Sequence, residues 1–247
     1  MKRACKVFAA VLALAMVLSF AGCSNSGTVT MATNAGFKPL EYREGDKIVG
    51  IDADMAAEIA KDMGKELQIV DMDFNAVVES VSSGKYDLGI AGLSKTPDRE
   101  KAVDFSEPYF ESQQMILVKS DNTTITNGDS LKGKKIAVQE GTLGQTIVEE
   151  LDGVNSKDIQ RYRNYVDAVE ALKSNKADAI VMDKYPAESF VNVNNGQLKM
   201  LDEVMATDVY CVAVKKGNTE LLEQVNKTIK RIQEDGTLEK IIKNYID

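Results

Sequence analysis

The same order of residue types occurs twice in this chain, 91 residues apart, over a pattern of helix, turn and strand. A Val-Glu pair, an aliphatic residue, a serine, a lysine and an aspartate recur at one spacing in residues 78–87 and 169–178. Reuse of one supersecondary unit predicts two lobes of the same βαβ design; a chance match over so short a stretch is the alternative. Around both copies, apolar runs typical of strands alternate with helical patterns, as in α/β proteins. The predicted strands include 29–33, 67–70, 87–91, 135–138 and 179–182.

The repeat aligns Gly92 with Asp183, each just beyond the carboxyl end of a predicted strand. Ligands of open α/β sheets bind outside that edge, so the two positions predict a binding site. A helix-start signal follows the first of them, because Thr96 has the residue type of a cap and Pro97 that of a first helical position.

Further helices are predicted from capping residues and from periodicity. Asn75 is predicted to cap a helix that follows a loop containing Phe74. Phe37 lies in a comparable loop after the first strand, and two such rings at one sheet edge could sandwich a ligand side chain or simply belong to the core. Additional helices are predicted at 55–63, 143–151, 167–174, 219–235 and 238–245.

Residues 1–22 have the features of a sorting signal. Three cations precede an unbroken apolar run at 7–18, which is shorter than the roughly 20 residues that span a bilayer. Small residues then lead to Cys23, an ending that looks like a bacterial lipobox, in which the cysteine is acylated (palmitate included) and becomes the new N-terminus. An uncleaved helical anchor with an incidental cysteine is the alternative. We predict a mature chain of 225 residues that begins with a tether at 23–27.

The composition excludes several classes of function. The chain has no histidine, so neither a Ser-His-Asp triad nor a histidine metal site can form, and we expect no metal and no cofactor. Removal of the signal changes the net charge from −8 to −11, which gives no electrostatic reason to bind nucleic acid. Cys211 is the single cysteine left after the signal and Cys23, so no disulfide can form within a monomer, the state that we expect.

Arg99 lies in the first turn of the helix that Thr96 is predicted to start. A helix N-terminus favours anions, and a guanidinium group binds a carboxylate through two parallel hydrogen bonds. Arg99 therefore predicts a carboxylate site; a surface ion pair with Asp98 or Glu100 is the alternative. Asp183, at the equivalent edge of the second lobe, could receive an ammonium group or cap the turn that follows it.

Several segments, in order along the mature chain, resemble the polar amino-acid solute-binding proteins of ABC importers, the bacterial extracellular solute-binding proteins of family 3. They are 36–41 (GFKPLE), 49–56 (VGIDADMA), 83–87 (SGKYD), 91–99 (AGLSKTPDR), 103–109 (VDFSEPY), 138–142 (VQEGT) and 226–237. The resemblance implies a two-lobed type II periplasmic-binding fold with two doubly crossed α/β lobes and a hinge. It places lobe I at 28–111 and 206–247, and lobe II at 112–205.

The resemblance also implies a ligand-binding site. Positions that match Gly92, Ser94 and Arg99 receive the α-carboxylate and part of the ammonium group. Thr142 matches a lobe II hydroxyl at the carboxylate, and Asp183 matches the acid for the ammonium group. The remaining implied ligand-binding residues are Asn34, Phe37, Phe74 and Gln139. Two departures leave the side-chain specificity open: Asn34 replaces an aspartate of several relatives, and Leu143-Gly144 replaces small polar residues.

These observations predict a lipid-anchored, extracytoplasmic protein that captures an amino acid and delivers it to a membrane permease. Acidic residues near the expected cleft favour a polar or basic amino acid. The alternatives are a dehydratase-like enzyme on the same fold, with Asp73 or Glu140 as a general acid, and an extracellular amino-acid sensor domain. The expected partners are the amino acid, the ABC permease and membrane lipid, and the protein is not expected to be an enzyme.

Overall fold

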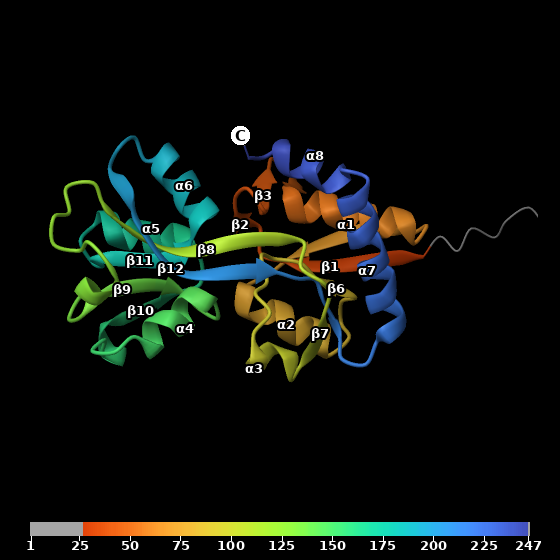
Figure 1. Ribbon diagram of the computed structural model, residues 1–247, viewed down its shortest axis with the longest axis horizontal. Coiled ribbons are helices and arrows are strands. Elements are labelled where there is room, and N and C mark those ends of the chain that lie inside the picture. The colour runs from red at the N-terminus through yellow and green to blue at the C-terminus, as the bar shows by residue number, and fades with distance from the viewer. Residues whose placement is uncertain (1–26, 247) are drawn as a thin grey trace, which may run out of the picture.

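The computed structural model describes residues 27–246, which form two α/β lobes joined by long strands (Figure 1). The predicted signal and Cys23, the predicted site of acylation, lie outside these residues. Each lobe contains one five-stranded sheet with helices on its faces. Lobe I contains β1 (Thr28–Thr33), β5 (Glu66–Asp71), β6 (Leu88–Gly89), β7 (Val103–Phe105) and β13 (Ala213–Lys215). Lobe II contains β8 (Phe110–Lys119), β9 (Ile136–Gln139), β10 (Ile159–Tyr162), β11 (Ala179–Asp183) and β12 (Leu198–Tyr210).

The helices are divided between the lobes in the same way. Lobe I carries α1 (Ile51–Asp62), α2 (Phe74–Ser82), α3 (Pro97–Glu100), α7 (Thr219–Glu234) and α8 (Thr237–Lys243). Lobe II carries α4 (Leu143–Glu150), α5 (Tyr165–Lys173) and α6 (Lys184–Val193), with 3-10 turns at Gly128–Leu131 and Ser156–Asp158. A small sheet of β2 (Gly36–Phe37), β3 (Glu41–Glu44) and β4 (Lys47–Val49) extends lobe I.

The two five-stranded sheets have one topology. Their orders are β5-β1-β6-β13-β7 and β10-β9-β11-β8-β12. In each sheet the first three strands are parallel, and the fourth and fifth each pair antiparallel with the strand before them. The two copies of the sequence repeat form α2 with β6 and α5 with β11, which occupy equivalent places. The repeat is therefore structural.

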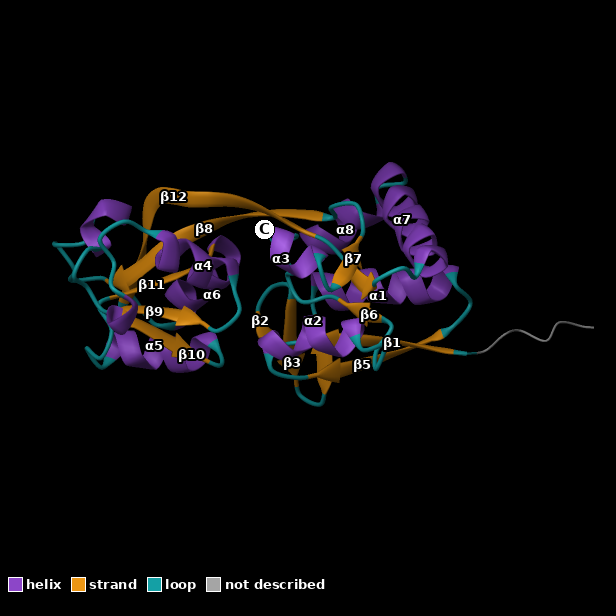
Figure 2. Ribbon diagram, turned by 90° about the horizontal axis from the view of Figure 1, so that it is seen from below, coloured by secondary structure: helices purple, strands orange, loops and turns teal. Residues whose placement is uncertain are grey.

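The connection between the lobes is strand-like, as the absence of a flexible linker in the sequence predicted. β8 and β12 pair from Phe110↔Tyr210 to Lys119↔Leu198 and cross from one lobe to the other (Figure 2). On the lobe I side, Tyr210 continues into an isolated bridge with Ser94.

Capping explains the start of α3 but not that of α2. Thr96 accepts a hydrogen bond from the backbone N–H of Arg99, and Pro97 is the first helical residue, as predicted. The prediction that Asn75 caps a helix is wrong, because α2 begins at Phe74 after an extended Asp73. Phe74 is 8% exposed, so burial of its ring fixes the first turn without a side-chain cap.

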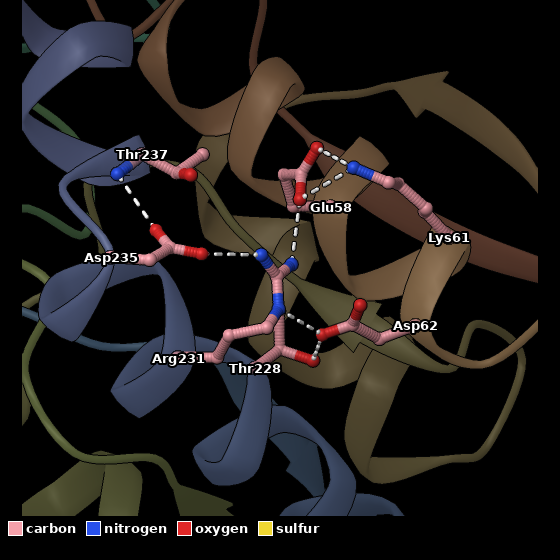
Figure 3. Close-up of polar contacts among 7 residues, drawn as sticks. All are labelled: Glu58, Lys61, Asp62, Thr228, Arg231, Asp235 and Thr237. Carbon is pink, nitrogen blue, oxygen red and sulfur yellow. Dashed lines mark hydrogen bonds and ion pairs between the residues drawn. The ribbon is translucent and has the colours of Figure 1, made fainter.

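One arginine joins α7 to α1, the first helix of lobe I. The guanidinium group of Arg231 on α7 donates to Glu58 (2.6 Å) and Asp62 (2.8 Å) on α1, and to Asp235 (3.1 Å) (Figure 3). Asp62 also accepts a hydrogen bond from Thr228 (2.9 Å), so one carboxylate links two residues of α7 to α1.

We expect Arg231→Ala to lower the Tm by about 2–5 °C, because an ion-pair network with several partners stabilises more than an isolated exposed pair. Thermal unfolding followed by circular dichroism measures the shift. Lys230→Ala is the control, since Lys230 makes one exposed pair with Glu234 at 3.8 Å on the same helix. Equal shifts for the two variants would contradict a stabilising role for the network.

Candidate ligand-binding site

The carboxyl ends of equivalent strands from the two lobes face each other. Asn34 follows β1 and Gln139 ends β9, and the side-chain amide of Gln139 donates to the side-chain oxygen of Asn34 across the interface (3.1 Å). Gln139 also donates to the backbone carbonyl of Arg163 (2.9 Å). The two predicted amide residues therefore meet, as expected for residues at facing sheet edges.

Arg99 spans the two lobes. Its guanidinium group donates to the carbonyl of Ser94 in lobe I (2.7 Å) and to the carbonyl of Gly141 in lobe II (2.9 Å), and it lies over the ring of Phe74 at 5.4 Å. Burial lowers the pKa of Arg99, and the nearby charges of Asp208 and Asp183 oppose that shift. Within residues 27–246, no carboxylate forms a salt bridge with it.

The surface alternative for Arg99 is wrong. Asp98 pairs with Lys101 at 2.6 Å and Glu100 pairs with Lys95 at 3.3 Å, so both neighbouring acids have other partners. Arg99 instead presents a half-buried cation to the space between the lobes.

Asp183 lies at the end of β11 and is 5% exposed. Its Oδ1 accepts hydrogen bonds from the side-chain amide of Gln114 (2.7 Å) and from the hydroxyl of Tyr210. It occupies the cap position of α6 without a side-chain cap bond, so capping is not its role. Burial raises the pKa of Asp183 to about 7, although the bond from Tyr210 favours the charged form.

Two more carboxyl groups are buried beside the site. Asp52 accepts hydrogen bonds from the backbone N–H of Gly92 (2.8 Å) and from the hydroxyl of Tyr109 (2.8 Å). Glu41 is 1% exposed, and neither of its oxygens accepts a hydrogen bond from residues 27–246. Burial is the main cause that raises the pKa of both groups, and the charges of Asp52 and Asp183 raise that of Glu41 further.

Aromatic rings from both lobes meet next to these carboxyl groups. Phe37 of lobe I stacks on Tyr165 of lobe II with 5.9 Å between the ring centroids. Gly92 has a φ of 53°, and a Cβ at this position would lie 2.9 Å from Cε1 of Phe37, so this position requires glycine. The hydroxyl of Tyr165 is buried and has no hydrogen-bond partner within the described chain.

The two predicted hydroxyl residues are both engaged within the protein. Ser94 donates to Oδ2 of Asp208 (2.5 Å), so only its oxygen lone pairs remain free to accept a bond from a ligand. Thr142 donates to the carbonyl of Gln139 (2.8 Å) and accepts from the backbone N–H of Gln145 (3.2 Å), which makes it the cap of α4. Serine here suits an ammonium group better than a carboxylate.

Sequence reasoning missed several residues of this region: Gln114, Asp208 and Tyr210 on the crossing strands, Asp52 on α1 and Tyr165 on α5. Buried polar atoms without partners are rare in folded proteins, so they indicate where a ligand could bond. In residues 27–246 they belong to Thr33, Glu41, Ser112, Gln114 and Tyr165. Only the strand register brings Gln114 beside Asp183, and no local motif marks that pairing.

The fold and this interlobe site define a solute-binding protein of the type II periplasmic-binding class. The chain belongs to the bacterial extracellular solute-binding proteins, family 3, whose family model matches residues 29–247.

Two arginine-binding proteins are similar to at least nine-tenths of the chain. The arginine-binding extracellular protein ArtP of Bacillus subtilis is 34% identical over 242 residues, which covers 94% of this chain and 93% of ArtP. An ancestral arginine-binding protein bound to arginine superposes with a TM-score of 0.85 at 38% identity, covering 90% of this chain and 99% of that one.

A third relative is named for binding three amino acids. The arginine-, lysine-, histidine-binding protein ArtJ of Geobacillus stearothermophilus superposes with a TM-score of 0.83 at 32% identity, covering 89% of this chain and 95% of ArtJ. The prediction of family and fold class is confirmed, and so is the prediction of amino-acid solute binding for ABC transport. The individual site residues stay predictions.

Proposed function

We propose that this protein binds a basic amino acid, arginine or lysine, and delivers it to the permease of an ABC importer. The observation that carries this proposal is the set of buried carboxyl groups beside the site, namely Glu41, Asp52 and Asp183. None of the three forms a salt bridge with a lysine or arginine within residues 27–246. Burying an ionised carboxylate costs free energy unless it is paired with a cation. A cationic ligand would supply the positive charge that no lysine or arginine side chain provides here.

In the proposed binding mode, Arg99 receives the α-carboxylate, and Asp183 with the Ser94 oxygen receives the α-ammonium group. The side chain then extends between Phe37 and Phe74 towards Glu41 and Asp52. Similarity to proteins named for binding arginine, lysine and histidine supports the choice of a basic ligand.

Calorimetry of the mature chain carrying Cys23→Ala tests the specificity with arginine, lysine, glutamine, glutamate and leucine. We expect arginine or lysine to bind at least tenfold more tightly than glutamine. We expect glutamate not to bind, because its side-chain carboxylate would lie beside the buried acids Glu41 and Asp52 with no cation to pair with. Glu41→Gln should reduce the ratio of the affinity for arginine or lysine to the affinity for glutamine. Tighter binding of glutamate than of arginine would overturn the assignment.

We propose further that the ligand leaves the protein unchanged. A dehydratase would need a general acid enclosed in the cleft, whereas Asp73 is an exposed partner of Arg163 at 3.8 Å and Glu140 is exposed to solvent. Mass spectrometry after prolonged incubation with arginine should recover arginine alone. Continued conversion over many turnovers would support the enzyme instead.

The lipid anchor and the lobe boundaries also remain proposals. Across residues 27–246, no helix has both the length and the apolar character needed to cross a bilayer. The short tether proposed after Cys23 would hold lobe I near the membrane, since β1 begins at Thr28. Both proposed boundaries fall within the crossing strands, 111 in β8 (Phe110–Lys119) and 205 in β12 (Leu198–Tyr210).

Cys23→Ala should release the protein from membranes, because stable anchoring needs at least two acyl chains and the cysteine thiol is their attachment point at the junction. Fractionation of cells into membrane and soluble material measures the change. Recovery of a processed Cys23→Ala protein with the membranes would contradict the lipobox.

A further inference from the structure

A cavity of about 720 Å³ adjoins the candidate site beside the crossing strands. Its wall combines residues from lobe I, from the crossing strands and from lobe II, including Ser94, Ser112, Thr207, Leu143 and Lys184. Pockets of roughly 300–1,000 Å³ hold ligands of drug size, so this cavity has room for more than a single amino acid.

The cavity lies at the α-carbon end of the proposed ligand and not at its side-chain end. Ser94, whose carbonyl holds Arg99, belongs to the wall, as does Lys184, the residue after Asp183. Neither phenylalanine of the site belongs to it. A group joined to the main chain of a captured amino acid would therefore enter this space, whereas a longer side chain would not.

Two cations of the wall are only loosely paired. Lys95 lies 3.3 Å from Glu100 with 44% of its side chain exposed, and Lys184 lies 3.9 Å from Glu188 with 35% exposed. The hydroxyl of Ser112 in the same wall is buried and has no hydrogen-bond partner among residues 27–246. These groups suit a carboxylate, which accepts hydrogen bonds and carries negative charge.

The acidic residues of the wall do not oppose this. Asp208 already accepts hydrogen bonds from the hydroxyl of Ser94 (2.5 Å) and from the backbone N–H of Val209 (2.7 Å). Glu111 is exposed to solvent. The Ser94–Pro97 loop forms one side of the cavity, and the carbonyl of Ser94 accepts a hydrogen bond from Arg99.

We propose that this cavity accepts a second residue joined through the α-carboxyl group of the first, so that the protein binds dipeptides whose N-terminal residue is basic. This inference rests on the proposed function. The first residue keeps its ammonium group on Asp183, its peptide carbonyl faces Arg99, and the terminal carboxylate of the second residue reaches Lys95 or Lys184.

Calorimetry of the mature chain with Cys23→Ala compares arginine, arginyl-alanine and alanyl-arginine. We expect arginyl-alanine to bind within about tenfold of arginine, and alanyl-arginine at least tenfold more weakly than arginyl-alanine. If arginine binds and arginyl-alanine does not, the dipeptide inference alone is overturned. Tighter binding of alanyl-arginine than of arginyl-alanine would overturn it as well. Failure of all three to bind would overturn the proposed function and the inference with it.

Variants separate the cavity from the amino-acid site. Lys95→Gln with Lys184→Gln should weaken arginyl-alanine about three- to tenfold and leave arginine unchanged. Lys132→Gln with Lys230→Gln is the matched control, because those lysines also pair at 3.3 and 3.8 Å but do not line the cavity. Thr207→Trp, at an exposed position of the wall, should block the dipeptide only; equal affinity of this variant for arginyl-alanine would overturn the inference.

Discussion

Arg99→Ala should weaken binding of the amino acid at least tenfold to a hundredfold. Hydrogen bonds to charged groups stabilise by roughly 1.5–3 kcal/mol each, and the variant removes a two-pronged donor from a half-buried position. Arg99→Lys should recover little, because one ammonium group cannot reproduce the planar arrangement of the guanidinium group. Calorimetry with the preferred basic amino acid measures both affinities.

The melting temperature of ligand-free Arg99→Ala, compared with that of wild type, is the control that separates a loss of affinity from a loss of stability. Asp98→Ala removes the exposed neighbour that pairs with Lys101 at 2.6 Å, and it should leave the affinity unchanged. Binding as tight as wild type by Arg99→Ala would refute the carboxylate site at this residue.

Affinity should fall about thirtyfold between pH 8 and pH 5.5, because Asp183 must be ionised to bind an ammonium group and its pKa is raised to about 7 in the empty site. Ligand binding near pH 6 should release close to one proton, which calorimetry in buffers of different ionisation enthalpy measures. Asp183→Asn should bind weakly at every pH and lose this pH dependence. A wild-type pH profile in Asp183→Asn would show that another group titrates.

Asp183 should have the opposite effect on the stability of ligand-free protein. Its folded pKa of about 7 lies above the value of about 3.9 for an unfolded aspartate, so the folded state holds the proton more tightly. The stability that protonation contributes is complete below about pH 4 and is lost as the pH rises through about 7. Asp183→Asn should therefore raise the Tm at pH 8 while it abolishes tight binding.

The sequence predicted the fold where local signals agree with long-range packing. The repeat that relates 78–87 to 169–178 located equivalent helices and strands, because both copies obey the same periodicity and end in the same turn. The predicted start of α2 was wrong, because burial of the Phe74 ring determines where this helix begins. Capping residues in the sequence do not indicate which side chains are buried. The short β6 was predicted too long, since only Leu88–Gly89 pairs within the sheet.

The candidate site was predictable only in part. Gly92, Ser94 and Arg99 lie in one segment with a recognisable cap, so the sequence shows them together. Gln114, Tyr210 and Asp208 reach the site through the register of β8 and β12, whose paired residues lie 79 to 100 positions apart in the sequence. The direction of the Ser94 hydrogen bond likewise depends on Asp208, a residue far away in sequence.

The position of β13 sets an order of assembly. Lobe II is built from one continuous stretch, β8 to β12, and can form while the rest of the chain is still being synthesised. In lobe I, β13 lies between β6 and β7, so that sheet stays divided until residues 213–215 are available. A chain cut before β13 leaves β6 with an unpaired edge, which invites pairing with other chains. Nascent or truncated chains should therefore expose an incomplete, aggregation-prone sheet of lobe I beside a folded lobe II. The helices α7 and α8, which follow β13, are the last elements to pack on lobe I.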